Sequence, residues 1–176
     1  MDNNGSKIIH SVLRFRDCDQ QSLTKLVNKL GMQVRMVASG ASIPGSFWGD
    51  DEAGLIKNVL YIRPDTPVHS ALHEACHFAC MDKNRRTTLH TNAGGDADEE
   101  NAVCYLQILL SDALPDMGRQ KIFADMDAWG YSFRLGSAQA WFENDAQDAR
   151  QWLVKKNLLS IAEKLTHANR ITSTQV

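Results

Sequence analysis

Apolar and polar positions follow different periods along the chain, and these periods predict strands and one helix in its first third. Branched apolar residues indicate strands at Lys7–Arg16, Met32–Val37 and Leu55–Arg63. Apolar side chains recur at helical spacing in Gln20–Leu30, as they do on the buried face of a helix. Several glycines and a proline predict a loop or a hairpin at Ser39–Gly54.

The helical period dominates the rest of the chain. Thr66 can cap the exposed amides of a helix, Pro67 suits a first helical position, and the apolar pattern continues to about Met81. A polar loop is expected at Asn84–Gly95, followed by a helix at Asp96–Leu110 whose acidic first turn suits the helix dipole. Further helices are expected at about residues 117–129 and 137–157, with a tail helix to about residue 169.

This order of elements predicts a single α+β domain over residues 1–176. Residues 1–63 would form a small mixed or antiparallel sheet of about three to four strands, together with the first helix. Residues 64–113 would supply two helices, the first of which packs on the sheet. Residues 114–170 would form a mostly helical last part.

Composition and charge are those of an ordinary globular protein, with 43% hydrophobic residues, 23% charged residues and a formal net charge of -2. General binders of nucleic acid or of anionic membranes carry a basic face, and the sequence shows none. No apolar stretch approaches the roughly 20 residues that span a bilayer, and the polar start does not resemble a secretory signal. We therefore expect a cytoplasmic protein with reduced cysteines and with neither a membrane nor a nucleic-acid partner.

His73, Glu74 and His77 form the pattern H-E-x-x-H in the middle of the helix expected after Pro67. Residues four apart lie one turn above each other, so both imidazoles can bind one ion, and neutral imidazole is a good zinc ligand. Glu74 lies at the edge of that face, where its carboxylate can take the proton of an attacking water. The pattern predicts one Zn2+ ion with Glu74 as general base. The competing interpretation is a buried helix whose histidines only satisfy hydrogen bonds.

A catalytic zinc site has three protein ligands and one open position, so a third ligand is needed. Cys80 and Lys83 stand where a metzincin would have its glycine and its third histidine, which points instead to a carboxylate in Asp96–Leu110. Glu99 lies at the end of the apolar stripe of that helix, where a carboxylate needs a positive partner such as a metal. Glu100 lies on a more polar face. We therefore prefer Glu99 as the third ligand and keep Glu100 as the alternative.

These residues resemble the gluzincin metallopeptidases, and in particular their minimal ImmA/IrrE-type members. In that type the ligand helix has the form E-x-x-A-x-x-aromatic with a Leu pair further on, which is matched here by Glu99, Ala102, Tyr105, Leu109 and Leu110. The resemblance covers about Val59–Leu110. It implies a zincin-like fold, zinc ligation by His73, His77 and Glu99, and Glu74 as general base.

Other polar residues are candidates for supporting roles. His69, one turn before His73, could support a ligand or be satisfied locally, and His90 in the loop could donate to an oxyanion or lie exposed. An oxyanion could also be stabilised by a tyrosine, for which the candidates are Tyr105, Tyr131 and Tyr61. A ligand imidazole could be oriented by a nearby aspartate, for which the candidates are Asp82, Asp96 and Asp98.

The expected function is hydrolysis of a peptide or protein substrate by a zinc metallopeptidase. The strand at Leu55–Arg63 could be an edge that holds an extended peptide. A regulatory or binding protein that retains a zincin-like zinc site without peptidase activity is the alternative, and Glu74→Gln separates the two because it should abolish hydrolysis and spare zinc. A structural zinc site closed by Cys80 or His69 is a third interpretation, in which chelation of the metal unfolds the protein.

Overall fold

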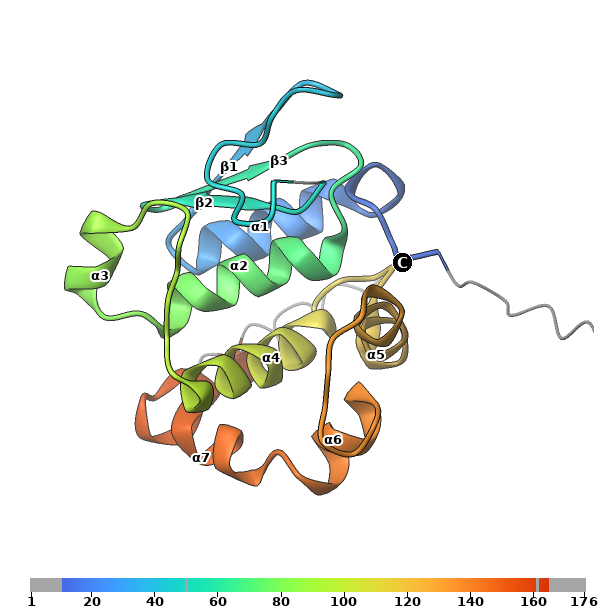
Figure 1. Ribbon diagram of the computed structural model, residues 1–176, viewed down its shortest axis with the longest axis vertical. Coiled ribbons are helices and arrows are strands. Elements are labelled where there is room, and N and C mark those ends of the chain that lie inside the picture. Colours follow the sequence, from blue (N-terminus) through green and yellow to red (C-terminus); the bar gives the residue numbers. More distant parts are fainter. Residues whose placement is uncertain (1–10, 50, 161, 165–176) are drawn as a thin grey trace, which may run out of the picture.

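The computed structural model describes residues 11–49, 51–160 and 162–164 (Figure 1). A small mixed sheet and helices make up these residues, which confirms the predicted α+β class. The elements in chain order are the 3-10 helix η1 (Phe15–Asp17), α1 (Gln20–Lys29), β1 (Gln33–Met36), β2 (Gly54–Ile56), β3 (Val59–Ile62), α2 (Val68–Cys80), α3 (Lys83–Thr88), α4 (Ala97–Ser111), α5 (Gly118–Trp129), α6 (Ala138–Asn144) and α7 (Gln147–Lys155).

The sheet has the order β1-β3-β2, with β1 parallel and β2 antiparallel to the central strand β3. The sequence predicted one strand at Leu55–Arg63, and this was wrong, because the segment forms the two strands β2 and β3. Lys57 has a φ of 50°, which reverses the chain and divides the segment into a hairpin. The outer side of β2 is also partly paired, because Lys57 N donates to Leu89 O and Thr91 N donates to Leu55 O, each across 2.9 Å.

The first predicted strand, Lys7–Arg16, is not seen in its described part. Residues 7–10 lie outside the described residues. Arg14 forms an isolated antiparallel bridge to Pro67, and the chain then turns into η1. Phe15 is buried there, and its N–H donates to Thr66 O across 2.9 Å, so this segment anchors the approach to α2 instead of joining the sheet.

Helix α2 carries the H-E-x-x-H pattern and lies between the sheet and α4 (Figure 1). Strands β2 and β3 contact α2 on one side. Thr66 does not cap α2 as expected. Its Oγ1 accepts the N–H of Arg63 across 2.9 Å and closes the preceding turn, and Pro67 is the residue before the helix. Because α2 is covered on both sides, nearly all of its side chains are buried.

The last part of the described chain is helical, as predicted, and packs around α4 through α5 and α7. The single helix expected at 137–157 is divided into α6 and α7, because Asp145 ends the first and pairs with Arg134. The tail expected to reach residue 169 lies mostly outside the described residues. Within the described part, no helix combines the length and apolar character that crossing a lipid bilayer requires.

Candidate metal centre

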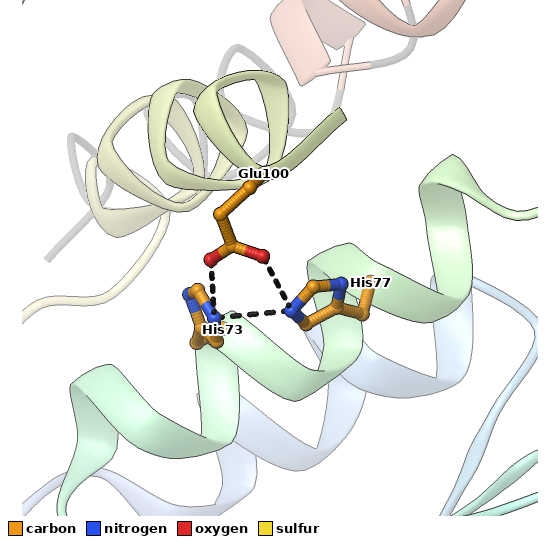
Figure 2. Close-up of side chains that lie close together, drawn as sticks. All are labelled: His73, His77 and Glu100. Atoms are coloured by element: carbon orange, nitrogen blue, oxygen red, sulfur yellow. Dashed lines mark hydrogen bonds and ion pairs between the residues drawn. The ribbon is translucent and has the colours of Figure 1, made fainter. Parts of the chain in front are cut away.

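Two histidines of α2 and one glutamate of α4 meet where these helices face each other (Figure 2). The Nε2 atoms of His73 and His77 lie 3.1 Å apart, one helical turn from each other. The carboxylate of Glu100 lies across both rings, with Oε1 3.2 Å from His73 Nε2 and Oε2 3.3 Å from His77 Nε2 (Figure 2). Three potential ligand atoms therefore converge on one point from two helices.

The spacing of these atoms suits a tetrahedral cation. Ligands about 2.0–2.1 Å from a tetrahedral zinc ion lie roughly 3.3–3.4 Å from one another. The separations of 3.1 to 3.3 Å among His73, His77 and Glu100 are close to this value. Among the residues that the structure describes, no fourth His, Cys, Asp or Glu joins the group. A metal bound there would keep a coordination position for water or substrate.

Gln107 fixes which nitrogen of His73 is free. Its Nε2 donates to the carbonyl oxygen of His69 across 3.4 Å, so its Oε1 is the acceptor for His73 Nδ1, 2.7 Å away. Nδ1 of His73 must then carry a proton, and Nε2 is the ring nitrogen that faces His77 and Glu100. Metal-bound histidines are commonly held in this way by a partner on their other nitrogen. The hydrogen bond thus holds the ring of His73 with Nε2 toward His77 and Glu100.

The structure places Glu100, the alternative third residue, beside the two histidines, and it places Glu99, the preferred one, elsewhere. Glu99 is buried, with 8% of its surface exposed, and it does find a positive partner, but that partner is Arg85 of α3. The guanidinium nitrogens lie 2.7 and 2.9 Å from the two carboxylate oxygens of Glu99. The apolar stripe misled the prediction because α4 is packed on several sides, by α2, α5 and α7, so burial does not identify the side that faces α2.

Glu74 lines the same cleft as the three converging side chains. Burial raises the pKa of its carboxyl to about 7; His73 opposes this rise, and the nearby carboxylates of Glu52 and Glu100 add to it. A carboxyl with a pKa near neutrality can both take up and release a proton at physiological pH. Its place beside the candidate ligands, outside their group, agrees with the position expected from the sequence.

The cleft around these residues has a volume of about 740 Å³. Its walls come from the loop before β2, from α2, from the start of α4 with the loop that precedes it, and from the end of α5. Carboxylates are its charged groups, and no lysine or arginine lines it among the described residues. The lining residues are Phe47, Trp48, Glu52, Ser70, His73, Glu74, His77, Thr91, Asn92, Ala93, Gly94, Gly95, Glu100, Trp129, Gly130 and Tyr131.

His69, His90 and Tyr105 do not line the cleft. His69 is fully buried beneath it; burial lowers its pKa to about 3, and its Nδ1 lies 3.5 Å from the hydroxyl of Tyr131. His90 is exposed and contacts the neighbouring Thr91. Tyr105 stacks on a phenylalanine in the core, with ring centroids 4.5 Å apart. Tyr131 is the tyrosine that lines the cleft, and its ring packs edge-on against His73.

The aspartates proposed to orient a ligand histidine have other roles. Asp82 and Asp96 accept backbone N–H groups at the starts of α3 and α4, each across 2.9 Å. Asp98 lines a separate hollow near α6. Gln107 orients His73 instead, and sequence reasoning missed this role. The sequence did contain an indication of it, because Gln107 follows Glu100 by seven residues and both side chains therefore lie on one face of α4.

Comparison with known proteins gives no match: no protein-family model fits the chain, and neither a curated protein nor a solved structure is significantly similar to it. The resemblance to the gluzincins therefore stays a prediction from the sequence, and the geometry of the site carries the functional argument.

Proposed function

We propose that this protein is a zinc-dependent peptidase with His73, His77 and Glu100 as ligands and Glu74 as general base. One observation carries the proposal: two imidazole nitrogens and a carboxylate lie within 3.1 to 3.3 Å of one another, in a cleft that also contains a carboxyl with a pKa of about 7. The location of the sheet on one side of α2 and of α4 on the other supports a zincin-like arrangement.

Each residue has a role in the proposed reaction. His73 and His77 offer neutral nitrogens to the ion, and the charge of Glu100 offsets part of the charge of a divalent cation. Zinc, when bound, supplies a Lewis acid that polarises the substrate carbonyl and lowers the pKa of water. Glu74 takes the proton from the attacking water and returns it to the leaving amine. Tyr131 lines the same cleft and is placed to donate a hydrogen bond to a developing oxyanion.

The arrangement argues against a structural site closed by Cys80 or His69. Neither residue contributes an atom to the group formed by His73, His77 and Glu100. His69 directs one ring nitrogen at Tyr131 and is packed against Trp129. An ion held by these three residues alone would keep the open position that a catalytic site requires. The four cysteines are free thiols, which supports the cytoplasmic location that we also propose.

Metal content and hydrolysis together test this proposal. The wild-type protein is expected to bind one zinc per chain, measured by atomic absorption, and to cleave quenched fluorescent peptides. Glu74→Gln should retain the metal and lose at least about a hundredfold in kcat/KM, the scale of general-base catalysis. His73→Ala and Glu100→Ala should lose the metal. Asp98→Asn is the control, because Asp98 is a carboxylate in the same turn of α4 that lies outside the cleft.

A binding module and a protein without a zinc site would each give a different result in these experiments. A protein that binds zinc but works only as a binding module would keep its function in Glu74→Gln. A wild-type chain that takes up no zinc would overturn the proposal.

A further inference from the structure

Two large aromatic side chains are exposed at the cleft. Phe47 and Trp48 have 54% and 72% of their surfaces exposed, and both line the cleft that contains the candidate metal centre. Their rings contact each other edge-on, with centroids 5.0 Å apart. The other large apolar residues that are strongly exposed in the described chain, Met36, Leu135 and Val154, do not line this cleft. Of these strongly exposed apolar side chains, Phe47 and Trp48 are therefore the ones that lie at the cleft.

The loop that carries the pair is fixed to the sheet by close backbone contacts. Gly45 O accepts the N–H of Leu55 across 3.1 Å, which ties the loop to β2. The approach is so close that a Cβ at Gly45 would lie 2.7 Å from Ile56 Cγ1. A Cβ at Gly54 would overlap the carbonyl oxygen of Pro44. The segment that carries the two rings is thus tied to β2 at Gly45, two residues before Phe47.

The charges in the cleft restrict what can lie beside this pair. Glu52, Glu74 and Glu100 line the cleft, and no lysine or arginine does so among the described residues. A divalent ion would offset Glu100 and part of the charge of Glu74, but Glu52 would still face the substrate. Trp129 Nε1 donates to Glu52 across 3.1 Å, which holds this carboxylate at the cleft wall. Acidic side chains of a peptide would be repelled there.

We infer that Phe47 and Trp48 form a subsite for a bulky apolar side chain of an extended peptide substrate, close to the bond that is cleaved. The inference rests on the proposed peptidase function and adds the class of substrate. The aromatic rings would cover a Phe or Leu side chain, and Glu52 would disfavour Asp or Glu in the same region. A small side chain such as that of alanine would make much less contact with the two rings.

The test uses octapeptides with a fluorophore and a quencher, in which one position is fixed as Phe, Leu, Ala, Lys or Glu and the others are randomised. The zinc-loaded wild type should cleave the Phe and Leu sets with kcat/KM at least about tenfold above the Ala set, the lower end of what one apolar pocket supplies. Trp48→Ala should reduce this preference to within about twofold. Trp48→Phe should largely keep it. Met36→Ala is the matched control, because Met36 is 50% exposed on β1 outside the cleft.

A second measurement separates this inference from the peptidase proposal. Fluorescence anisotropy of the labelled Phe and Ala sets is measured with zinc-loaded Glu74→Gln protein and with the same protein carrying Trp48→Ala. If wild-type hydrolysis occurs without a preference for Phe or Leu, or if Trp48→Ala keeps that preference, the subsite is wrong and the peptidase stands. If no peptide is hydrolysed but the Phe set binds more tightly through Trp48, the subsite stands and the peptidase is wrong. If neither set is cleaved or bound, both are wrong.

Discussion

His73 Nδ1 donates to Gln107 Oε1 across 2.7 Å, and this bond joins α2 to α4 directly behind the candidate metal centre. It sets the proton of the imidazole on the side away from the cleft. A ligand held in one tautomer and one orientation binds a metal more tightly than one that must be selected from several.

Replacing Gln107 by methionine is therefore expected to weaken zinc binding by about 10- to 100-fold, the usual effect of losing a partner of a metal-bound histidine. Methionine has a similar length and removes the acceptor. Affinity is measured by competition with a chromophoric chelator. Ser111→Ala is the control, because Ser111 is also a buried polar residue of α4 but its hydroxyl donates to Ile108 O within the helix. Equal affinities of Gln107→Met and wild type would show that the hydrogen bond does not orient the ligand.

The neighbouring glutamates of α4 should respond differently to the same substitution. Glu100→Gln removes the charge that faces the two imidazoles and should lower zinc affinity strongly. Glu99→Gln should leave the zinc stoichiometry unchanged, because the Glu99 carboxylate is bound by Arg85. Zinc titration of both variants decides between the two. Loss of zinc in Glu99→Gln alone would favour the ligand preferred from the sequence.

Arg85 is expected to stabilise one wall of the cleft. Besides Glu99, its guanidinium donates to the carbonyl oxygens of Ala93 and Gly94, across 2.8 and 2.9 Å. Arg85→Met would leave the buried carboxylate of Glu99 without its partner and should lower the free energy of unfolding by about 1–3 kcal/mol, allowing for the partial exposure of Arg85. Urea denaturation measures this. The double variant Arg85→Met/Glu99→Met should recover part of the loss. If its loss in free energy of unfolding equalled the sum of the losses of the two single variants, the explanation would be contradicted.

Glu74 should make the metal-free protein less stable at high pH. Its folded-state pKa is raised from 4.5 to about 7, so the folded protein holds the proton more tightly than the unfolded chain does. Ionisation of Glu74 lowers the free energy of unfolding very little below about pH 4.5, and this loss grows until the pH passes 7. Glu74→Gln should therefore stabilise the chelator-treated protein at pH 8 by about 1–2 kcal/mol, after allowance for the partial exposure of Glu74, and by much less at pH 4.5. Glu143→Gln, an exposed substitution, is the control. A gain of the same size at both pH values would contradict this origin.

The loop that presents Phe47 and Trp48 should depend on Gly54. Gly54→Ala would drive a methyl group into the carbonyl oxygen of Pro44 and should cost more than about 1 kcal/mol of stability. Gly31→Ala tests the left-handed backbone conformation alone, since Gly31 has a φ of 88° and open space around its Cα. Thermal denaturation compares the two. If Gly54→Ala were no more destabilising than Gly31→Ala, the close packing of this loop on β2 would not be a stabilising contact.

The periodic pattern predicted α1, α2 and α4 close to their observed places, because each has a long apolar face and a capping or proline residue near its start. It did not predict the turn at Lys57, because lysine is not a residue type that indicates a left-handed backbone conformation. The pattern did not show which of Glu99 and Glu100 faces the two histidines, for a related reason. A pattern shows that a side chain is buried, but which neighbour receives it depends on α3, whose Arg85 comes from a segment expected to be a loop. Gln107 was missed because its partner lies on another helix.

The candidate ligands belong to two stretches of chain that the Thr91–Gly95 loop and α3 separate. Two come from the middle of a helix that is covered on both sides, and the third from the first turn of α4, where helices open most readily. An ion in this position would tie the more loosely held end of one helix to the most firmly packed part of another. Loss of the ion should then increase amide hydrogen exchange first at the start of α4 and in the loop before it. The amides in the interior of α2 would remain protected.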